Sequence, residues 1–149
     1  FCVLGLGNLQ RRDDGVGCLT VRAFAQKIGD MDIIISESDD PAALWYIERD
    51  VAFLVIVDAV FSGAEPGAIF RLDATKDALP REYFPTVSTH VLQLADAIEI
   101  ARVLMRLPEK VIVYGIEGAD YSFGDGLTPE VERASDDVVG RLLHELTMK

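Results

Sequence analysis

The stretch "VAFLVIVD", Val51 to Asp58, runs through seven consecutive apolar residues before it reaches a carboxylate. A strand that is apolar on both faces is typical of a parallel sheet with helices packed on each side. Around this run, other short apolar segments alternate with longer helical patterns. The sequence therefore predicts an α/β fold, a three-layer α/β/α sandwich around a five-stranded, mostly parallel, twisted sheet.

The neighbouring patterns set the expected order of the elements. Helices are predicted at 16–28, 41–50, 89–106 and from 129 onward, and further strands at 1–4, 31–36, 68–72 and 110–117. Only the ten residues "DAVFSGAEPG", 58–67, separate the central strand from the strand at 68–72. This connection is too short for a helical crossover, so we expect an antiparallel edge strand there. Residues 73–88 are polar, contain two prolines and are predicted to form a loop.

Composition limits the classes of function. The chain has 149 residues, half of them apolar, which suits a single domain covering 1–149. Its net charge of −11, from 25 acidic and 14 basic residues, argues against nucleic acid or an anionic membrane as a partner. The two cysteines form no CxxC pair, and no apolar run approaches a membrane span. We therefore expect a cytoplasmic protein.

The segment "GLGNLQRRDDGVG", Gly5 to Gly17, follows the first strand and looks at first like a nucleotide-binding loop. A dinucleotide fingerprint needs a third glycine where Gln10 stands. Asp13 and Asp14 would also repel a pyrophosphate, and the chain has no lysine-bearing P-loop. We interpret these glycines instead as residues that let the chain turn tightly into the first helix, with φ above zero where needed.

Three residues are candidates for chemistry. The chain lacks GxSxG, HExxH and CxxC motifs, and His144 is interpreted as a surface residue. Asp14 follows the first strand, Asp58 closes the central strand and His90 begins a predicted helix, so all three can reach one crevice at the carboxyl ends of the strands. Asp58 could instead cap a loop. Spacing leaves open whether the set binds a divalent metal or serves in acid/base catalysis.

Four ordered segments resemble the endopeptidases that mature nickel-iron hydrogenases. "GLGNLQRRDDGVG" resembles the opening motif GxGNxxxxDDGxG of that family, and "VIVDAVFSGAEPG" is similar to its central VDAxxxxxxPG. "STHVLQLADAIEIA" and "VYGIEGADYSFGDGLTPEVERA" resemble its later two segments. The resemblance covers almost the full length of the chain and implies a twisted five-stranded sheet between helices.

The resemblance also implies a specific function. Such enzymes remove a C-terminal extension from the hydrogenase large-subunit precursor, cutting after a basic residue, once nickel has been inserted. Matched to the motifs, the metal-contacting residues are Asp14, Asp58 and His90. The nickel is supplied by the substrate precursor, and cadmium or zinc is expected to occupy the same site. We expect a monomer, with Asp14 or Asp58 activating water.

Two alternatives stay open. The chain could process another metalloprotein precursor, or it could be a non-catalytic metal-binding or nucleotide-binding module. It also departs from the family pattern, because Glu37, Asp39 and Asp40 replace small residues after the second strand. Arg11 and Arg12 are unusual beside the aspartates; they could pair with these aspartates, but we expect them to be solvated.

Overall fold

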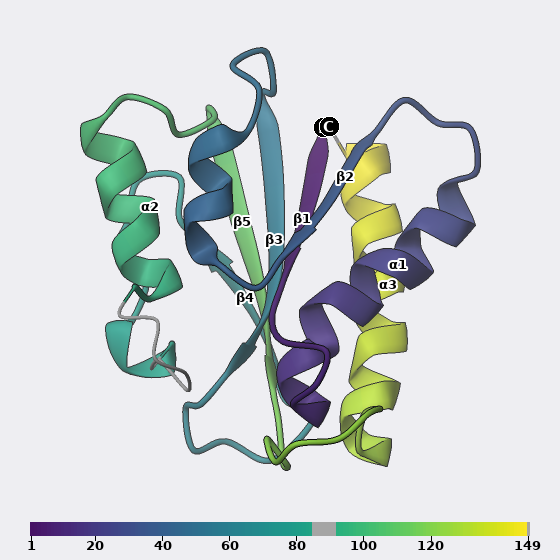
Figure 1. The fold of residues 1–149 in the computed structure, drawn as a ribbon. Coiled ribbons are helices and arrows are strands. Elements are labelled where there is room, and N and C mark those ends of the chain that lie inside the picture. The colour runs from purple at the N-terminus through teal and green to yellow at the C-terminus, as the bar shows by residue number, and fades with distance from the viewer. Residues whose placement is uncertain (85–91, 149) are drawn as a thin grey trace.

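The computed structural model describes residues 1–84 and 92–148 (Figure 1). Five strands form one sheet in the order β2-β1-β3-β5-β4. The strands are β1 (Cys2–Leu6), β2 (Ile34–Ser38), β3 (Phe53–Val60), β4 (Ile69–Asp73) and β5 (Lys110–Glu117). All neighbours pair in parallel except β4, which runs antiparallel to β5 at one edge. The predicted mostly parallel sheet with one antiparallel edge strand is confirmed.

Helices cover both faces of this sheet, as Figure 1 shows. The α-helices are α1 (Val16–Ile28), α2 (Leu94–Val103) and α3 (Pro129–Met148), and the short 3-10 helices are η1 (Arg12–Gly15), η2 (Pro41–Tyr46) and η3 (Arg81–Tyr83). One face of the sheet packs against α1 and α3, and the other against α2 and η2. The three layers follow from the apolar character of β3 on both sides.

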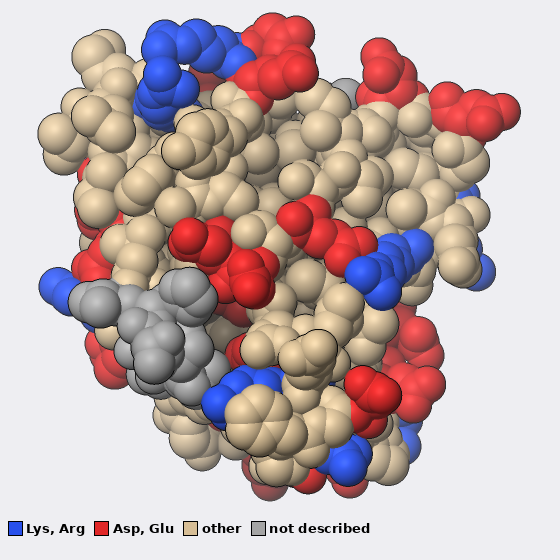
Figure 2. All heavy atoms as spheres, viewed as in Figure 1, with Lys and Arg blue, Asp and Glu red and all other residues tan. Residues whose placement is uncertain are grey.

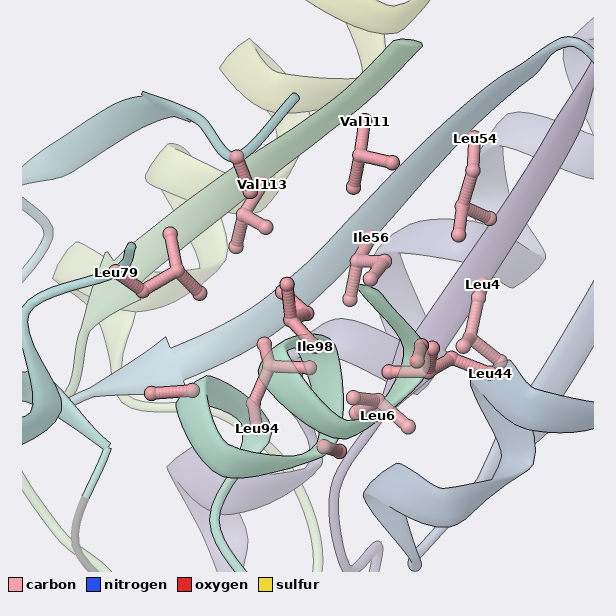
Figure 3. Close-up of a cluster of buried hydrophobic side chains, with 14 of the residues drawn as sticks. Leu4, Leu6, Leu44, Leu54, Ile56, Leu79, Leu94, Ile98, Val111 and Val113 are labelled. Carbon is pink, nitrogen blue, oxygen red and sulfur yellow. The ribbon is translucent and has the colours of Figure 1, made fainter. Parts of the chain in front are cut away.

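Each face of the sheet has its own apolar core. On the side of α2, leucine, isoleucine and valine side chains of the strands meet Leu44 of η2 and Leu94 and Ile98 of α2 (Figure 3). On the other side, Phe24 of α1 and Leu142 of α3 pack on the alternate residues of the same strands. Both cores use β3, whose residues 54–57 are fully buried. The central strand therefore holds the two layers together.

The strands end at different heights, and this stagger shapes the site. The pairing of β1 with β3 ends at Gly5 opposite Val57, whereas β5 follows β3 as far as Val60. Asp58 is thus the first residue of β3 that has lost its neighbour in β1. It lies inside β3 rather than at the end of the strand, because β5 keeps the backbone extended for two more residues.

Three predicted boundaries were wrong. The second strand lies at 34–38 instead of 31–36, because its register places Ile34 opposite Cys2 of β1. The helix predicted at 41–50 is only the 3-10 turn η2, which Asp40 caps by accepting a hydrogen bond from the Ala42 N–H. The long helix begins at Leu94, since Gln93 is extended, and residues 89–91 of that prediction lie outside the described residues.

The end of α2 also comes earlier than predicted. Met105 adopts a left-handed backbone conformation with φ of 57°. The Arg106 N–H donates to the Ala101 carbonyl over 2.9 Å, which is the closing hydrogen bond of a Schellman motif. This motif stops the helix before Pro108, the residue that the sequence suggested as its boundary.

Acidic side chains dominate the surface, in keeping with the net charge of −11. Several of them lie together across the middle of the face shown in Figure 2, between apolar and neutral atoms. Within residues 1–84 and 92–148, no helix has both the length and the apolar character that crossing a membrane requires.

Candidate functional site

The site lies at the carboxyl ends of β1 and β3, which point toward the lower end of the sheet in Figure 1. The connection after β1 leaves on the face of α1, and the connection after β2 passes over the other face through η2. In open α/β sheets, ligands bind in the crevice where successive connections leave on opposite faces. Asp14, in the turn after β1, and Asp58, in β3, lie at this end of the sheet, and the charge of Asp14 acts on Asp58.

Glycines bring the backbone of the first turn close to the sheet. Gly7 has φ of +139°, and a Cβ built there would lie 1.9 Å from the Asp14 carbonyl oxygen. A Cβ on Gly17 would lie 2.2 Å from the Val57 carbonyl oxygen. Gly7 is the only one of the four glycines in this segment with a positive φ, whereas Gly17 is needed for close approach. The turn therefore places Asp14 directly beside the end of β3.

Asp14 and Asp58 are held by few hydrogen bonds. The Asn8 N–H donates to Asp14 Oδ2 over 3.1 Å, and the Ala59 N–H donates to Asp58 Oδ1 over 2.8 Å. Asp14 is 8% exposed, and Asp58 is partly exposed. Asp58 thus does bond an adjacent backbone amide, which was the alternative interpretation of that residue. This bond occupies one carboxylate oxygen, Oδ1.

Both carboxyl groups hold protons more strongly than usual. Burial raises the pKa of Asp14, partly offset by the Asn8 N–H and by Arg11. Burial raises the pKa of Asp58 well above its usual value, and the negative charge of Asp14 raises it further. Two neighbouring carboxyls whose pKa values are pushed apart are typical of acid/base pairs and of cation-binding sites.

The third candidate residue, His90, lies outside the described residues. Within the described part of the chain, no three His, Cys, Asp or Glu side chains gather into a group that could hold a metal ion. The charge of Asp14 reaches Asp58, and the metal-contacting roles of Asp14, Asp58 and His90 stay predictions. His144 is exposed on α3, as expected.

A cavity of about 430 Å³ lies beside the turn after β1, at the carboxyl ends of β1 and β2. Its lining includes the backbone of residues 7–10, Cys18, and Glu37 to Asp39. Arg22 makes a bidentate pair with Glu37, with N–O distances of 2.8 and 2.9 Å. Glu37 and Asp39, two of the acidic residues that depart from the family pattern, therefore line this cavity, whereas Asp40 caps η2.

Cys18 at this cavity has the properties of a structural residue. Its thiol donates weakly to the Gly5 and Gly7 carbonyls, and only 3% of the residue is exposed. Burial, followed by Glu37 and Asp58, raises the pKa of Cys18 to about 12. Because the thiolate is the nucleophilic form, this environment does not suit a cysteine nucleophile.

Sequence reasoning missed the role of Asp13. Its carboxylate turns away from the crevice and accepts hydrogen bonds from the 118–128 loop, the segment between β5 and α3. The arginines beside it are partly exposed and also contact this loop: Arg11 lies 4.3 Å over the Phe123 ring, and Arg12 pairs with Asp120 at 3.7 Å. The buried environment of Asp13 gave no sequence signal, since most of its donors are backbone groups.

Known proteins resemble this chain over most of its length. The family model described as hydrogenase maturation protease (HycI) matches residues 39–145. The hydrogenase 2 maturation protease of Escherichia coli is 28% identical over 148 residues, covering 97% of this chain and 88% of the relative. The hydrogenase expression/formation protein HupD of Bradyrhizobium diazoefficiens is 28% identical over 134 residues, covering 87% and 68%.

A solved structure has the same fold. The hydrogenase maturating endopeptidase HybD from E. coli superposes with a TM-score of 0.75 at 24% identity, covering 99% of this chain and 91% of that one. The fold is an α/β/α sandwich that this chain shares with that endopeptidase. The chain belongs to the hydrogenase maturation protease family and is a peptidase.

Proposed function

We propose that this peptidase removes the C-terminal extension of a nickel-iron hydrogenase large-subunit precursor after nickel insertion. In this proposal Asp14, Asp58 and His90 recognise the nickel that the precursor carries. The observation that supports it most is the pairing of Asp14 and Asp58 at the crevice, each with one oxygen that accepts a backbone hydrogen bond. Carboxylate oxygens together with an imidazole suit a divalent first-row metal.

Because their pKa values are raised, the two carboxyl groups change their charge state when a cation comes near. Burial and the charge of Asp14 favour the protonated form of Asp58 in the free enzyme. A nearby cation favours the ionised form of both carboxyls. Precursor that carries nickel therefore binds more tightly than precursor without it, which is the differential affinity that a checkpoint requires. Asp14 or Asp58 then acts as general base on the water that attacks the peptide bond.

Cleavage of defined precursors tests the proposal. Purified large-subunit precursor, with and without inserted nickel, is incubated with wild type, Asp14→Asn, Asp58→Asn and His90→Ala, and the mass of the large subunit is measured. We expect one C-terminal cut in the nickel-loaded precursor alone, and a loss of at least about 100-fold in rate for each aspartate variant. Exposed Asp30→Asn is the matched control and is expected to cleave at the wild-type rate. Near wild-type rates for both Asp14→Asn and Asp58→Asn would rule out the assigned chemistry.

A binding measurement separates this function from the non-catalytic alternatives. Calorimetric titration with Ni²⁺, Cd²⁺ and Zn²⁺ is compared with titration with NAD and ATP, for wild type and His90→Ala. We expect metal binding that weakens in the variant and no nucleotide binding. Nucleotide binding without a metal effect would favour a nucleotide-binding module instead.

A further inference from the structure

Asp13 is a fully buried carboxylate that the proposed chemistry does not use. Its Oδ2 accepts hydrogen bonds from the Ala119 N–H at 2.8 Å, the Asp120 N–H at 2.9 Å and the Thr128 hydroxyl at 2.9 Å. Its Oδ1 accepts from the Thr128 N–H at 2.8 Å. No ion pair reaches this carboxylate among the described residues, so these four donors compensate its charge.

Backbone hydrogen bonds extend the same attachment along the turn. The Asp13 N–H donates to the Asp120 carbonyl at 3.0 Å, and the Arg12 N–H donates to the Gly124 carbonyl at 3.1 Å. The Gly124 N–H donates in return to the Gln10 carbonyl at 2.8 Å. Arg12 has φ of 44°, a conformation that a non-glycine residue rarely adopts without such support. The turn from Gln10 to Asp13 is therefore fixed to the 118–128 loop from both sides.

Asp14 itself has much weaker support. Its side chain accepts one hydrogen bond from the described residues, from the Asn8 N–H at 3.1 Å. Its backbone is confined by Gly7, which leaves no room for a Cβ against the Asp14 carbonyl. The position of this carboxylate is thus set by the turn that carries it, and the turn is set by the contacts of Asp13.

We propose that Asp13 is the positioning residue of the site, fixing the turn between β1 and α1 on the 118–128 loop so that Asp14 meets Asp58. This rests on the function proposed above. The adjacent aspartates then have separate tasks: Asp14 touches the substrate metal or the attacking water, and Asp13 acts only through Asp14. A displacement of a catalytic group by about 1 Å can lower a rate about 100-fold, so this support matters for turnover.

Two variants alter the attachment in different ways. Asp13→Asn keeps the shape of the side chain but turns an NH₂ group toward backbone donors. Thr128→Val keeps the carboxylate and removes only the hydroxyl donor, whereas Thr128→Ser retains it. Glu145→Gln is the matched control: Glu145 is another buried acid, 7% exposed, and it lies 17 residues beyond Thr128 along α3, about 25 Å away.

The first readout is independent of cleavage. In ¹⁵N–¹H spectra the Asn8 amide reports its hydrogen bond to Asp14. We expect Asp13→Asn and Thr128→Val to shift this resonance and speed its hydrogen exchange at least about 10-fold, with Thr128→Ser and Glu145→Gln close to wild type. If Asp13 only anchors the 118–128 loop, the amides of Ala119, Asp120 and Thr128 change while Asn8 does not, and the proposal fails. Should Asp13→Asn not fold, Thr128→Val decides the same question.

The second readout is the cleavage rate per folded molecule, measured well below the unfolding temperature. We expect kcat to fall about 10- to 100-fold in Asp13→Asn and less in Thr128→Val, with Thr128→Ser restoring the rate. In an Asp14→Asn background the effect of Asp13→Asn should vanish, and an equal loss there would overturn the proposal. If wild type cleaves no precursor, the proposed function fails, and the Asn8 resonance still tests the positioning role.

Discussion

Adjacent residues with the same side chain serve different purposes in this protein. Both residues are buried, but four donors surround the Asp13 carboxylate, whereas the Asp14 side chain accepts one hydrogen bond. Rotation along the η1 turn points the two side chains in different directions, so the pair cannot share one environment. A carboxylate with several donors is fixed, and one with few donors is free to bind a cation or a proton.

Gly7 provides the first prediction at this scale. We expect Gly7→Ala to lower the free energy of unfolding by about 2–3 kcal/mol, because the methyl group adds a clash with the Asp14 carbonyl to an unfavourable φ. Gly63→Ala is the matched control, since Gly63 also has positive φ, +84°, but no atom within 4 Å of the point that a Cβ would occupy, and should cost about 1 kcal/mol. Urea unfolding measures both, and equal losses would show that the close approach of Gly7 is unimportant.

The buried thiol gives the second prediction. Because burial raises the pKa of Cys18 to about 12, iodoacetamide at pH 8 should leave this residue unmodified in the folded protein. Treated enzyme should therefore retain its cleavage rate, and peptide mass mapping should find alkylation of Cys18 only after denaturation. Rapid modification accompanied by loss of cleavage would point to a cysteine nucleophile instead.

At the scale of elements, α1 and α3 are joined by a polar contact within an apolar layer. The hydroxyl groups of Thr20 and Ser135 lie 2.6 Å apart, and both residues are buried. The helices otherwise pack through residues such as Phe24 and Val138. A buried hydroxyl group without a hydrogen-bond partner lowers stability by its full desolvation cost. Removing either hydroxyl therefore destabilises the protein through the one that is left.

A double-mutant cycle tests this dependence. We expect Thr20→Val and Ser135→Ala each to lower the free energy of unfolding by about 1–2 kcal/mol. The double variant should lose less than the sum of the two, because no hydroxyl is left without a partner. Chemical denaturation of the four proteins supplies the cycle, and strictly additive losses would contradict the contact.

The attachment of α3 to the sheet edge makes stability depend on pH. Burial alone would raise the pKa of Glu145, but Arg71 Nε at 2.7 Å and the Tyr114 hydroxyl at 2.8 Å outweigh it and hold this pKa below its usual value. A lowered folded-state pKa adds stability above the unfolded value, about 4.3, and this stability is lost as pH falls through the folded value. Glu145→Gln should therefore be less stable than wild type at pH 7.

The difference in the free energy of unfolding between wild type and Glu145→Gln should become smaller as the pH is lowered below about 4. Urea unfolding of wild type and Glu145→Gln at a series of pH values measures it. A difference that stays constant down to the lowest pH would mean that the charge of Glu145 contributes nothing.

At the scale of the whole molecule, the net charge of −11 sets the long-range electrostatics. The six ion pairs among the described residues are mostly exposed, and exposed pairs contribute little. Repulsion between the excess carboxylates therefore opposes folding at neutral pH.

Salt should relieve this repulsion. We expect raising NaCl from 10 to 300 mM at pH 7.5 to increase Tm by about 2–5 °C, because the Debye length falls to below 10 Å. Near the isoelectric point, about pH 4.5, the same change should have little effect. Thermal unfolding followed by circular dichroism measures both, and a fall in Tm at pH 7.5 would show that the ion pairs outweigh the repulsion.

Most of the architecture could be predicted from the sequence because it depends on apolar pattern and connection length. The run from Val51 to Val57 indicated a strand covered on both faces, and the short connection after it indicated the antiparallel β4. The start of β2 could not be read in this way, since its register against Cys2 is a property of the sheet. Similarly, methionine rarely adopts a left-handed backbone conformation, so nothing in the sequence indicated that Met105 would end α2 in this way.

The candidate site was predictable in part for the same reason. Asp14 follows β1, and Asp58 lies in β3 one residue beyond its pairing with β1, so their nearness at one end of the sheet follows from topology. The contacts of Asp13 were not predictable, because three of its four donors are backbone N–H groups, which every residue but proline has.

These contacts also determine when, during synthesis of the chain, the turn that carries Asp14 can take its final structure. The donors to Asp13 come from residues 106 to 115 positions later in the chain. While the chain is being synthesised, the Asp13 carboxylate has none of them until residue 119 has emerged, and lacks the pair from Thr128 for longer. The turn that carries Asp14 can therefore take its final conformation only after the 118–128 loop has been synthesised.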